Sequence, residues 1–253
     1  MKKSIFIVAS LLVFAACNKE VLNAPQENCG ILQLSVQSDD NIKVTTKAGG
    51  VNTDNFDVKI IDSQNNVEKT GKASTLTVVV LPADTYTISA ENISESLALE
   101  SNDGKGALRM AGSVSVPLGQ SETKSVTLNC QPTNSKITVS YDDTFVNAFN
   151  TYSVNLDHNG DRDFTSITAD ADYFYNITSD AYVDVKLTAK SKANVDVTHT
   201  QKVDLAVGYH YAITYMATPD GQLSVSITAS DALTSSPVEV PVNPYAPAPN
   251  TAE

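Results

Sequence analysis

Apolar and polar residues alternate over short stretches along nearly the whole chain. Leu32, Leu34 and Val36 are separated by Gln33 and Ser35. A period of two puts successive side chains on opposite faces of a β-strand, so this stretch predicts a strand with one buried face. The same alternation recurs at residues 56–60, 76–80, 86–90, 114–118, 126–130, 137–141, 152–156, 183–187, 195–199, 209–215 and 223–227. The sequence therefore predicts an all-β fold.

Turn-forming residues separate these stretches. Residues 63–66 read Ser-Gln-Asn-Asn and residues 82–84 read Pro-Ala-Asp, which are sequences typical of tight turns. The alternation restarts after residues 131–134. Many short antiparallel strands in each half predict two tandem β-sandwich domains, transthyretin-like or immunoglobulin-like, over residues 31–132 and 133–230.

A short helical insertion is predicted in the second domain at residues 143–150. Asp143 or Thr144 can cap its first turn, because their side-chain oxygens can accept from free backbone N–H groups. Phe145 and Phe149 are spaced for contact along one face of that helix.

The composition limits the function. The 253 residues carry a formal net charge of −12, with 17 Lys and Arg against 29 Asp and Glu, so no basic surface is available to bind nucleic acid. The three histidines fall in no H-E-x-x-H pattern, and the chain has no G-x-S-x-G motif. We therefore predict a non-enzymatic protein with no cofactor and no metal site.

The first residues resemble a bacterial lipoprotein signal. Two lysines precede an apolar run at residues 5–14, which is too short to span a bilayer, and Ala-Ala-Cys17 follows. This end is similar to a lipobox, in which the last cysteine becomes the first mature residue and is acylated, with palmitate among its chains. We predict a signal peptide over residues 1–16, lipid attachment at Cys17 and a tether over residues 17–30 that reaches the membrane through lipid. The alternative is an ordinary secreted protein with a free Cys17.

Two further cysteines, Cys29 and Cys130, form an even pair in an oxidising compartment, which favours a disulfide. Strand parity opposes that bond, because Cys130 shares the inward phase of Val126 and Leu128 whereas Cys29 is out of phase with Leu32. The alternatives are a Cys29–Cys130 disulfide and a buried free thiol at Cys130, and parity favours the second.

Residues 157–163 carry oxygen ligands at alternate positions, as a calcium-binding loop does. Arg162 stands where such a loop needs glycine, and Asn159-Gly160 is a strong hairpin signal. A hairpin turn is therefore favoured over a cation site.

The last residues, 231–253, contain repeated prolines, which favour an extended tail. Val238, Val240 and Val242 alternate within this tail, so an edge strand is the alternative.

Tyr173 and Tyr175 are candidates for contact with a glycan, together with the tyrosines at residues 209–215. Alternate positions of a strand can equally place such rings in a core, and the chain has no Trp, the best residue for stacking on sugars. Core packing is therefore favoured for these tyrosines, and also for His199, which follows the inward phase of Val197.

The layout resembles the fimbrillin-like surface adhesins, of the major and minor fimbrium subunit type, and a related lipoprotein family of unknown function from Gram-negative gut anaerobes. The segments that carry the resemblance are residues 17–20, 43–48, 81–88 and 141–145, which read Cys-Asn-Lys-Glu, Lys-Val-Thr-Thr-Lys-Ala, Leu-Pro-Ala-Asp-Thr-Tyr-Thr-Ile and Tyr-Asp-Asp-Thr-Phe. Fimbrillins are two-domain transthyretin-like sandwiches of surface pili, in which a protease cuts after a basic residue and a neighbour's strand fills the freed groove. The resemblance implies processing at Lys47 and partners among other pilus subunits.

We therefore expect a non-catalytic lipoprotein of the outer membrane, displayed at the cell surface. Its expected role is that of an adhesin, a pilus component or a surface scaffold that contacts pilus subunits, host proteins or glycans. The alternative function is that of a glycan-binding lipoprotein in a carbohydrate-uptake system.

Overall fold

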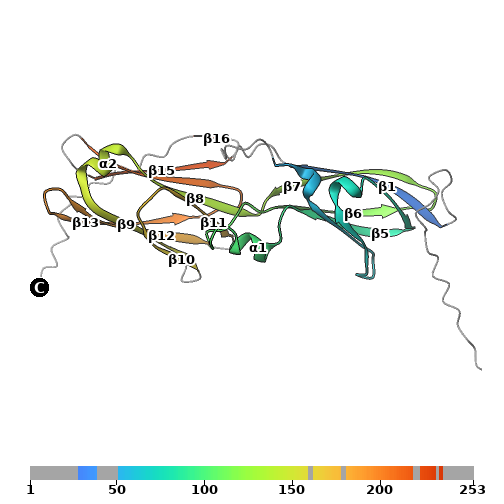
Figure 1. The fold of residues 1–253 in the computed structure, drawn as a ribbon. Helices are drawn as coiled ribbons and strands as arrows, with labels where there is room; N and C mark the ends of the chain where they lie inside the picture. The colour runs from blue at the N-terminus through green and yellow to red at the C-terminus, as the bar shows by residue number, and fades with distance from the viewer. Residues whose placement is uncertain are drawn as a thin grey trace, which may run out of the picture.

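Two β-sandwiches follow one another along the chain and lie end to end (Figure 1). The computed structural model describes residues 28–38, 51–158, 162–177, 181–218, 223–231 and 234–235. Strands make up most of the described chain, and short helices make up the rest of its regular structure. The predicted fold class is confirmed, with two tandem sandwiches and a helical insertion in the second. The exact boundaries predicted for the domains stay predictions.

The first sandwich is one seven-stranded sheet, in the order β3-β2-β5-β6-β7-β1-β4, that curls into two layers. Between β6 and β7 the described residues pair only as Met110 with Pro132 and Ala111 with Gln131, so the sheet divides there. Its elements are β1 (Cys29–Ser38), η1 (Thr53–Asn55), β2 (Asp57–Ile61), β3 (Val67–Lys72), η2 (Ala73–Thr75), β4 (Val78–Pro82), β5 (Asp84–Glu91), α1 (Glu95–Glu100), β6 (Met110–Leu118) and β7 (Thr123–Pro132).

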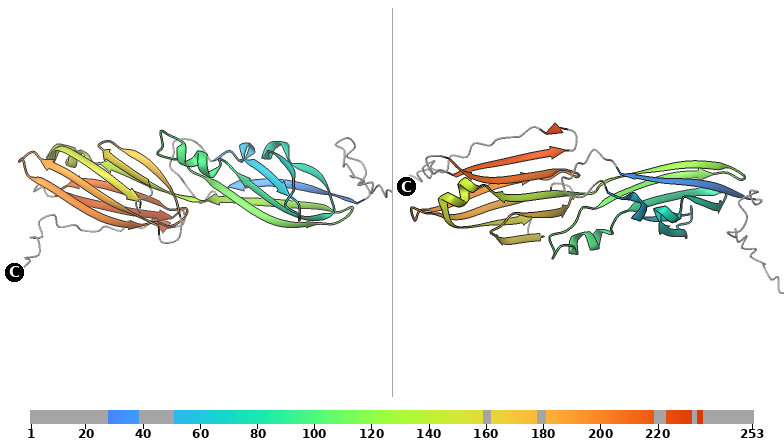
Figure 2. Two further views of the ribbon diagram at one scale, coloured as in Figure 1. Left: turned by 90° about the horizontal axis from the view of Figure 1, so that it is seen from below. Right: turned by 45° about the horizontal axis from the view of Figure 1, so that its top comes forward.

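The second sandwich has a four-stranded sheet, β10-β9-β12-β13, and a five-stranded sheet, β11-β8-β14-β15-β16. Figure 2 shows these two layers and the first sandwich from two other sides. Its elements are β8 (Asn134–Tyr141), α2 (Asp143–Ala148), β9 (Phe149–His158), β10 (Arg162–Ile167), β11 (Ala171–Asn176), β12 (Tyr182–Ser191), β13 (Asp196–Asp204), β14 (His210–Ala217), β15 (Leu223–Asp231) and β16 (Thr234–Ser235).

The two sandwiches share one scheme of strand pairing. In each, the first strand pairs in parallel with the seventh, as β1 does with β7 and β8 does with β14. In each, the first strand also pairs antiparallel with the fourth, as β1 does with β4 and β8 does with β11. Strand β15, which pairs with β14, has no counterpart among the described residues of the first sandwich.

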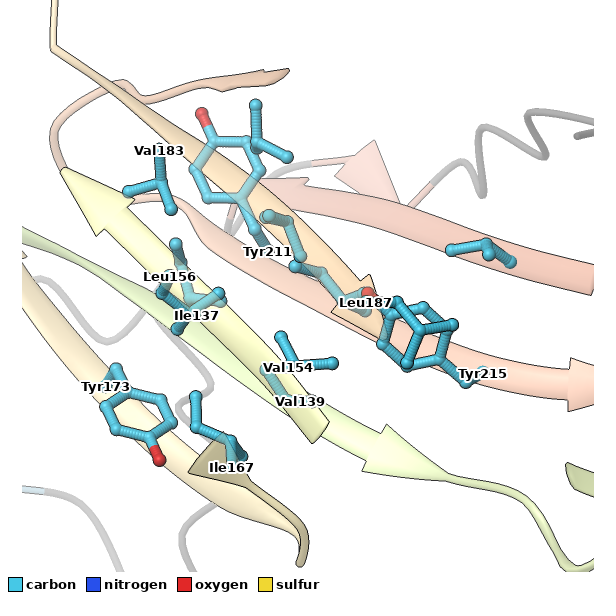
Figure 3. Close-up of a cluster of buried hydrophobic side chains, with 14 of the residues drawn as sticks. Ile137, Val139, Val154, Leu156, Ile167, Tyr173, Val183, Leu187, Tyr211 and Tyr215 are labelled. Atoms are coloured by element: carbon cyan, nitrogen blue, oxygen red, sulfur yellow. The ribbon is translucent and has the colours of Figure 1, made fainter. Parts of the chain in front are cut away.

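Each sandwich has its own hydrophobic core, built from alternate strand residues as the period of two predicts. The core of the first sandwich includes Leu32, Ile60 and Leu128. The core of the second sandwich is richer in aromatic rings, and Figure 3 shows Tyr173 beside Ile167 and Tyr215 near Leu187.

Strand β4 differs in phase from the prediction that Leu76, Val78 and Val80 face inward. Val79 and Leu81 are buried, and Val78 is 47% exposed. The cause is Leu76, which ends η2 with φ −111° and ψ 30° and is therefore not extended. A non-extended residue interrupts the alternation, so the strand that follows starts its phase afresh.

Helix α2 lies within the predicted insertion, and its aromatic pair is confirmed. The rings of Phe145 and Phe149 stack with centroids 4.4 Å apart. The cap is Asp142 rather than Asp143 or Thr144, because the Asp142 carboxylate accepts from the backbone N–H of Thr144 at 2.8 Å. A hydrogen bond from the Thr144 hydroxyl, at 2.7 Å, and the one from its backbone N–H hold the pKa of Asp142 below its ordinary value.

Candidate functional site

Two of the predicted sites, the lipid attachment at Cys17 and the processing site at Lys47, lie outside the described residues. The prolines and valines of the tail beyond residue 235 also lie outside them. Before that point, β16 pairs with β15 through Thr234 and Ser235.

The candidate disulfide between Cys29 and Cys130 is wrong, because the thiol of Cys130 is free and buried. The parallel register of β1 and β7 places Ser38 opposite Cys130. Cys29 and Ser38 are nine steps apart along one extended strand, so the two cysteines lie on the order of 30 Å apart. The Cys130 thiol contacts the Ala90 carbonyl oxygen at 3.6 Å, and burial raises its pKa to about 11.

The candidate glycan contacts Tyr173 and Tyr175 are also wrong. Tyr173 is 4% exposed, Tyr175 is fully buried, and both rings belong to the core of the second sandwich. Phe174, on the opposite face of β11, is buried as well, because residues of the first sandwich cover it. The Cβ position of Gly106, with φ +90°, lies 3.0 Å from the Phe174 Cβ, so this approach leaves little room for a side chain.

Strands β9 and β10, which flank the predicted hairpin turn, pair antiparallel with His158 opposite Arg162, and residues 159–161 lie outside the described residues. Within the residues that the structure describes, no group of three or more His, Cys, Asp or Glu side chains is placed to hold a metal ion. His199 is half-buried on the inward face of β13, in the phase predicted for it, and burial lowers its pKa.

A polar cluster on the outer face of β8 has the residue types of a hydrolase but the wrong hydrogen bonding. The Thr138 hydroxyl donates to the Asp172 carboxylate at 2.8 Å and lies 2.7 Å from Nε2 of His210. Since its one proton goes to Asp172, Nε2 of His210 must donate to Thr138 instead of accepting from it. A nucleophile and its general base need the opposite polarity. Lys136, 8% exposed, completes the cluster by an ion pair with Asp172 at 2.8 Å.

The N-terminal strand enters the first sandwich at the end that faces away from the second. Strand β1 runs parallel to β7, and β7 leads directly into β8 of the second sandwich. The backbone N–H of Ser121, in the turn before β7, donates to the Cys29 carbonyl oxygen at 2.8 Å. The start of β1 therefore lies at the outer pole of the first sandwich (Figure 1).

The junction between the sandwiches is built mainly from backbone carbonyls and one guanidinium group. Arg162, on β10, donates to the carbonyl oxygens of Leu99 and Gly104 in the first sandwich and of Phe174 in the second. The backbone N–H of Phe174 donates to the Lys105 carbonyl oxygen at 2.8 Å. Charge-assisted donors of this kind fix one arrangement of the two bodies, because each carbonyl has a set direction.

A buried asparagine adds further contacts across the junction. Asn134 is 2% exposed, and its side chain donates to the Ala107 carbonyl oxygen at 2.8 Å and accepts from the backbone N–H of Arg109 at 3.2 Å. Both polar ends of the amide are thereby satisfied. The connection between the sandwiches is consequently held by Asn134 as well as by Arg162.

The far pole of the second sandwich carries α2 over a cluster of aromatic rings. Phe145 is fully buried and lies 5.0 Å from Tyr152 and 5.8 Å from Tyr215, measured between ring centroids. The Thr144 hydroxyl accepts from the backbone N–H of Ala217, which ties α2 to the end of β14. Val146 on α2 remains 43% exposed. This pole is a well-packed, partly apolar surface, and it lies at the end of the molecule opposite to the start of β1.

The sequence did not point to the junction. Arg162 stands out in the sequence only as a departure from a calcium loop, and its carbonyl partners in the first sandwich, Leu99 and Gly104, are more than fifty residues away along the chain. Helix α1, which contributes the first-sandwich side of the junction, could have been predicted from the sequence. Ser94 and Glu95 are residues that favour the start of a helix.

Within the described residues, no helix combines the length and the apolar character needed to cross a membrane.

Comparisons with known proteins give a family and several similar folds. The model of the family "Domain of unknown function (DUF4493)" matches residues 28–244. No curated protein matches the chain. Among solved structures, a candidate cell adhesion protein from Parabacteroides distasonis has a TM-score of 0.46 at 9% identity, over 83% of this chain and 100% of that one.

Two further solved structures are similar. A candidate adhesin from Bacteroides thetaiotaomicron has a TM-score of 0.45 at 10% identity, over 85% of this chain and 99% of that one. The fimbrial anchor protein Mfa2 from Porphyromonas gingivalis has a TM-score of 0.39 at 12% identity, over 81% of this chain and 98% of that one. At these values the similarity carries no argument about activity.

Proposed function

We propose a surface role for this chain, which belongs to the DUF4493 family because that family's model matches residues 28–244. In this proposal the chain is a non-catalytic lipoprotein, anchored in the outer membrane through Cys17 and displayed on the cell. It acts there as an adhesin or as a component of a fimbria.

The observation that carries the proposal is the position of the N-terminal strand. Because β1 starts at the outer pole of the first sandwich, a lipid anchor at Cys17 would hold that pole nearest to the membrane. The contacts of Arg162 and Asn134 at the junction then direct the second sandwich outward. The pole that carries α2 would be the part presented to a partner.

A fimbrial role is supported by the edge of β7. In the second sandwich the equivalent edge, on β14, is covered by β15 along its length. In the first sandwich the described residues cover the β7 edge only at Gln131 and Pro132, through β6. An exposed strand edge can accept a strand from another chain, and cleavage after Lys47 would be the step that prepares it. Adhesion and fimbrial anchoring, which the names of the similar structures describe for those proteins, agree with these roles.

Anchoring is tested by expressing the full chain and its Cys17→Ala variant in a Gram-negative host that lipidates exported proteins. We expect palmitate label, outer-membrane fractionation and sensitivity to external protease for the wild-type chain, and a soluble, unlabelled product for the variant. Cys130→Ala, at a free cysteine, serves as the matched control and should keep its label. Equal labelling of wild type and Cys17→Ala would contradict the anchor.

Assembly is tested separately from anchoring. We expect higher-order species, resolved on a denaturing gel without boiling, after limited trypsin digestion of the wild-type chain. The Lys47→Gln variant should give far fewer of them, and Lys186→Gln, at an exposed lysine on β12 of the second sandwich, should match the wild type. A monomer under every condition would leave an adhesin or scaffold and remove the fimbrial role.

A further inference from the structure

A hollow of about 640 Å³ lies on the outer face of the sheet formed by β3, β2, β5 and β6. The strand register aligns four of its residues in one row across the sheet: Thr70, Lys59, Ser89 and Ser113. Their side chains point away from the core, because the alternate residues Val58 and Ala90 are 2% exposed. With neighbouring strands about 4.8 Å apart, the row spans on the order of 14 Å.

Several of the residues that line the hollow are small, among them Gly71, Ala111 and Gly112. Gly112 lies on β6 between Ala111 and Ser113, where β6 meets β7. A Cβ atom at Gly112 would lie 2.4 Å from the Asn129 carbonyl oxygen, so any larger residue would push the two strands apart. Gly112 therefore permits a close approach of β6 and β7 beside the hollow.

The charges around the hollow leave one cation without a counter-ion. Asp57 pairs with Lys72 at 2.7 Å, and Glu91 pairs with Arg109 at 2.8 Å. Within the described part of the chain, Lys59 has no ion-pair partner, although it lies in the middle of the hydroxyl-bearing row. The floor of the hollow therefore offers an ammonium group flanked by hydroxyls.

These groups match a ligand that carries both a carboxylate and many hydroxyls. An ammonium group binds a carboxylate by a charge-assisted hydrogen bond. Ser and Thr hydroxyls can donate to and accept from sugar hydroxyls, and the Glu91 carboxylate can accept from them. The length of the row suits a short oligosaccharide laid across the strands, and the shallow, open face suits a chain rather than an enclosed small molecule.

We propose that this hollow binds an acidic saccharide, with its carboxylate on Lys59 and its hydroxyls on Thr70, Ser89 and Ser113. This site is on the first sandwich, away from Tyr173 and Tyr175, and it depends neither on the lipid anchor nor on assembly. It would give the surface protein a ligand of defined charge.

The test uses the full mature chain and two probes of equal length, an oligosaccharide of galacturonic acid and one of galactose. We expect calorimetric titration to give binding of the acidic probe that weakens with salt, and binding of the neutral probe at least about tenfold weaker. Lys59→Gln should weaken the acidic probe by about tenfold, and Ser89→Leu, which fills the hollow, should weaken it further. Lys186→Gln, which removes an exposed lysine of the second sandwich, should leave it within about twofold.

Three results would overturn the proposal: no binding of the acidic probe at millimolar concentration, equal binding of both probes, or equal affinity in wild type and Lys59→Gln. Because Lys59 is exposed, its substitution should leave the far-UV circular dichroism spectrum unchanged. Perturbation of the backbone amide chemical shifts of Ser89 and Ser113 during titration with the acidic probe is a second measurement, and it locates the ligand without any variant.

Discussion

Nη2 of Arg162 donates a hydrogen bond to the Leu99 carbonyl oxygen at 2.7 Å, and this contact joins a strand of the second sandwich to α1 of the first. Nη1 of the same guanidinium donates to the Phe174 carbonyl oxygen at 3.0 Å, within the second sandwich. One side chain therefore contacts both bodies at once.

Arg162→Met should loosen the junction and leave both cores folded. Loss of charge-assisted hydrogen bonds to carbonyls costs about 1.5–3 kcal/mol in unfolding free energy. We expect the urea unfolding of the two sandwiches, monitored by tyrosine fluorescence, to separate into two transitions. Small-angle scattering should show a broader distribution of particle lengths. Lys186→Met, an exposed control, should match the wild type in both measurements, and an unchanged scattering profile for Arg162→Met would contradict the assignment.

Phe145→Ala should strongly destabilise the second sandwich. Phe145 is fully buried and contacts Phe149, Tyr141 and Tyr152, so its loss leaves a cavity that costs about 3–5 kcal/mol. Its neighbour Val146 is 43% exposed, and Val146→Ala should change stability by less than about 0.5 kcal/mol. Chemical denaturation of the two variants measures both values, and similar losses would show that α2 does not pack as described.

The thiol of Cys130 should make the first sandwich sensitive to alkaline pH. Burial raises its pKa in the folded protein from 9.0 to about 11, so the unfolded chain releases the proton first as the pH rises. The contribution of the Cys130 thiol to the free energy of unfolding is therefore fully present below about pH 9. It is lost between about pH 9 and 11 and amounts to at most on the order of 2–3 kcal/mol. Denaturation midpoints at pH 8 and pH 10.5 measure the loss.

Cys130→Ala is the matched control for that titration, since tyrosines and lysines ionise over the same range. The variant should start from a lower stability and lose less of it on alkalinisation. Alkylation of Cys130 in the wild-type chain should require denaturant, and rapid labelling of the native protein would contradict its burial.

Acid should destabilise the second sandwich through His199. Burial lowers the pKa of this imidazole below about 6.5 in the folded protein, whereas the unfolded chain binds a proton near that pH. The unfolded state therefore gains protons first as the pH falls, and stability declines below about pH 6.5. His199→Gln should flatten the decline between pH 7 and pH 5, as thermal denaturation would show. His210→Gln should also flatten the decline in stability, because burial and Lys136 lower the pKa of His210. If the double variant lost stability with acid as steeply as the wild type, neither histidine would be the cause of the acid sensitivity.

The fold could be predicted where alternation and turn residues agree, and less well elsewhere. In strands such as β1 and β14, apolar and polar residues alternate so regularly that only one set of residues can face the core. Strand β4 contains Val78, Val79 and Val80, which admit either phase, and only the non-extended backbone of Leu76 decides between them. Local apolar pattern thus determines the existence of a strand better than its orientation.

The junction lay beyond prediction because it depends on partners that are distant in the sequence. Nothing near Arg162 indicates that carbonyls of α1 and its loop will meet its guanidinium. The burial of Phe174 has the same origin, since its face of β11 would be exposed without the first sandwich. Tyr173 and Tyr175, in contrast, were placed correctly by the favoured alternative of core packing.

The parallel pairing of β1 with β7 has a mechanical consequence. A force that pulls the start of β1 one way and the second sandwich the other way acts along these two neighbouring strands in opposite directions. Eight residue pairs, from Ile31 with Thr123 to Ser38 with Cys130, then bear the load in shear and must yield together instead of opening one by one. A chain tethered at that end would resist detachment by flow far better than its modest thermodynamic stability suggests.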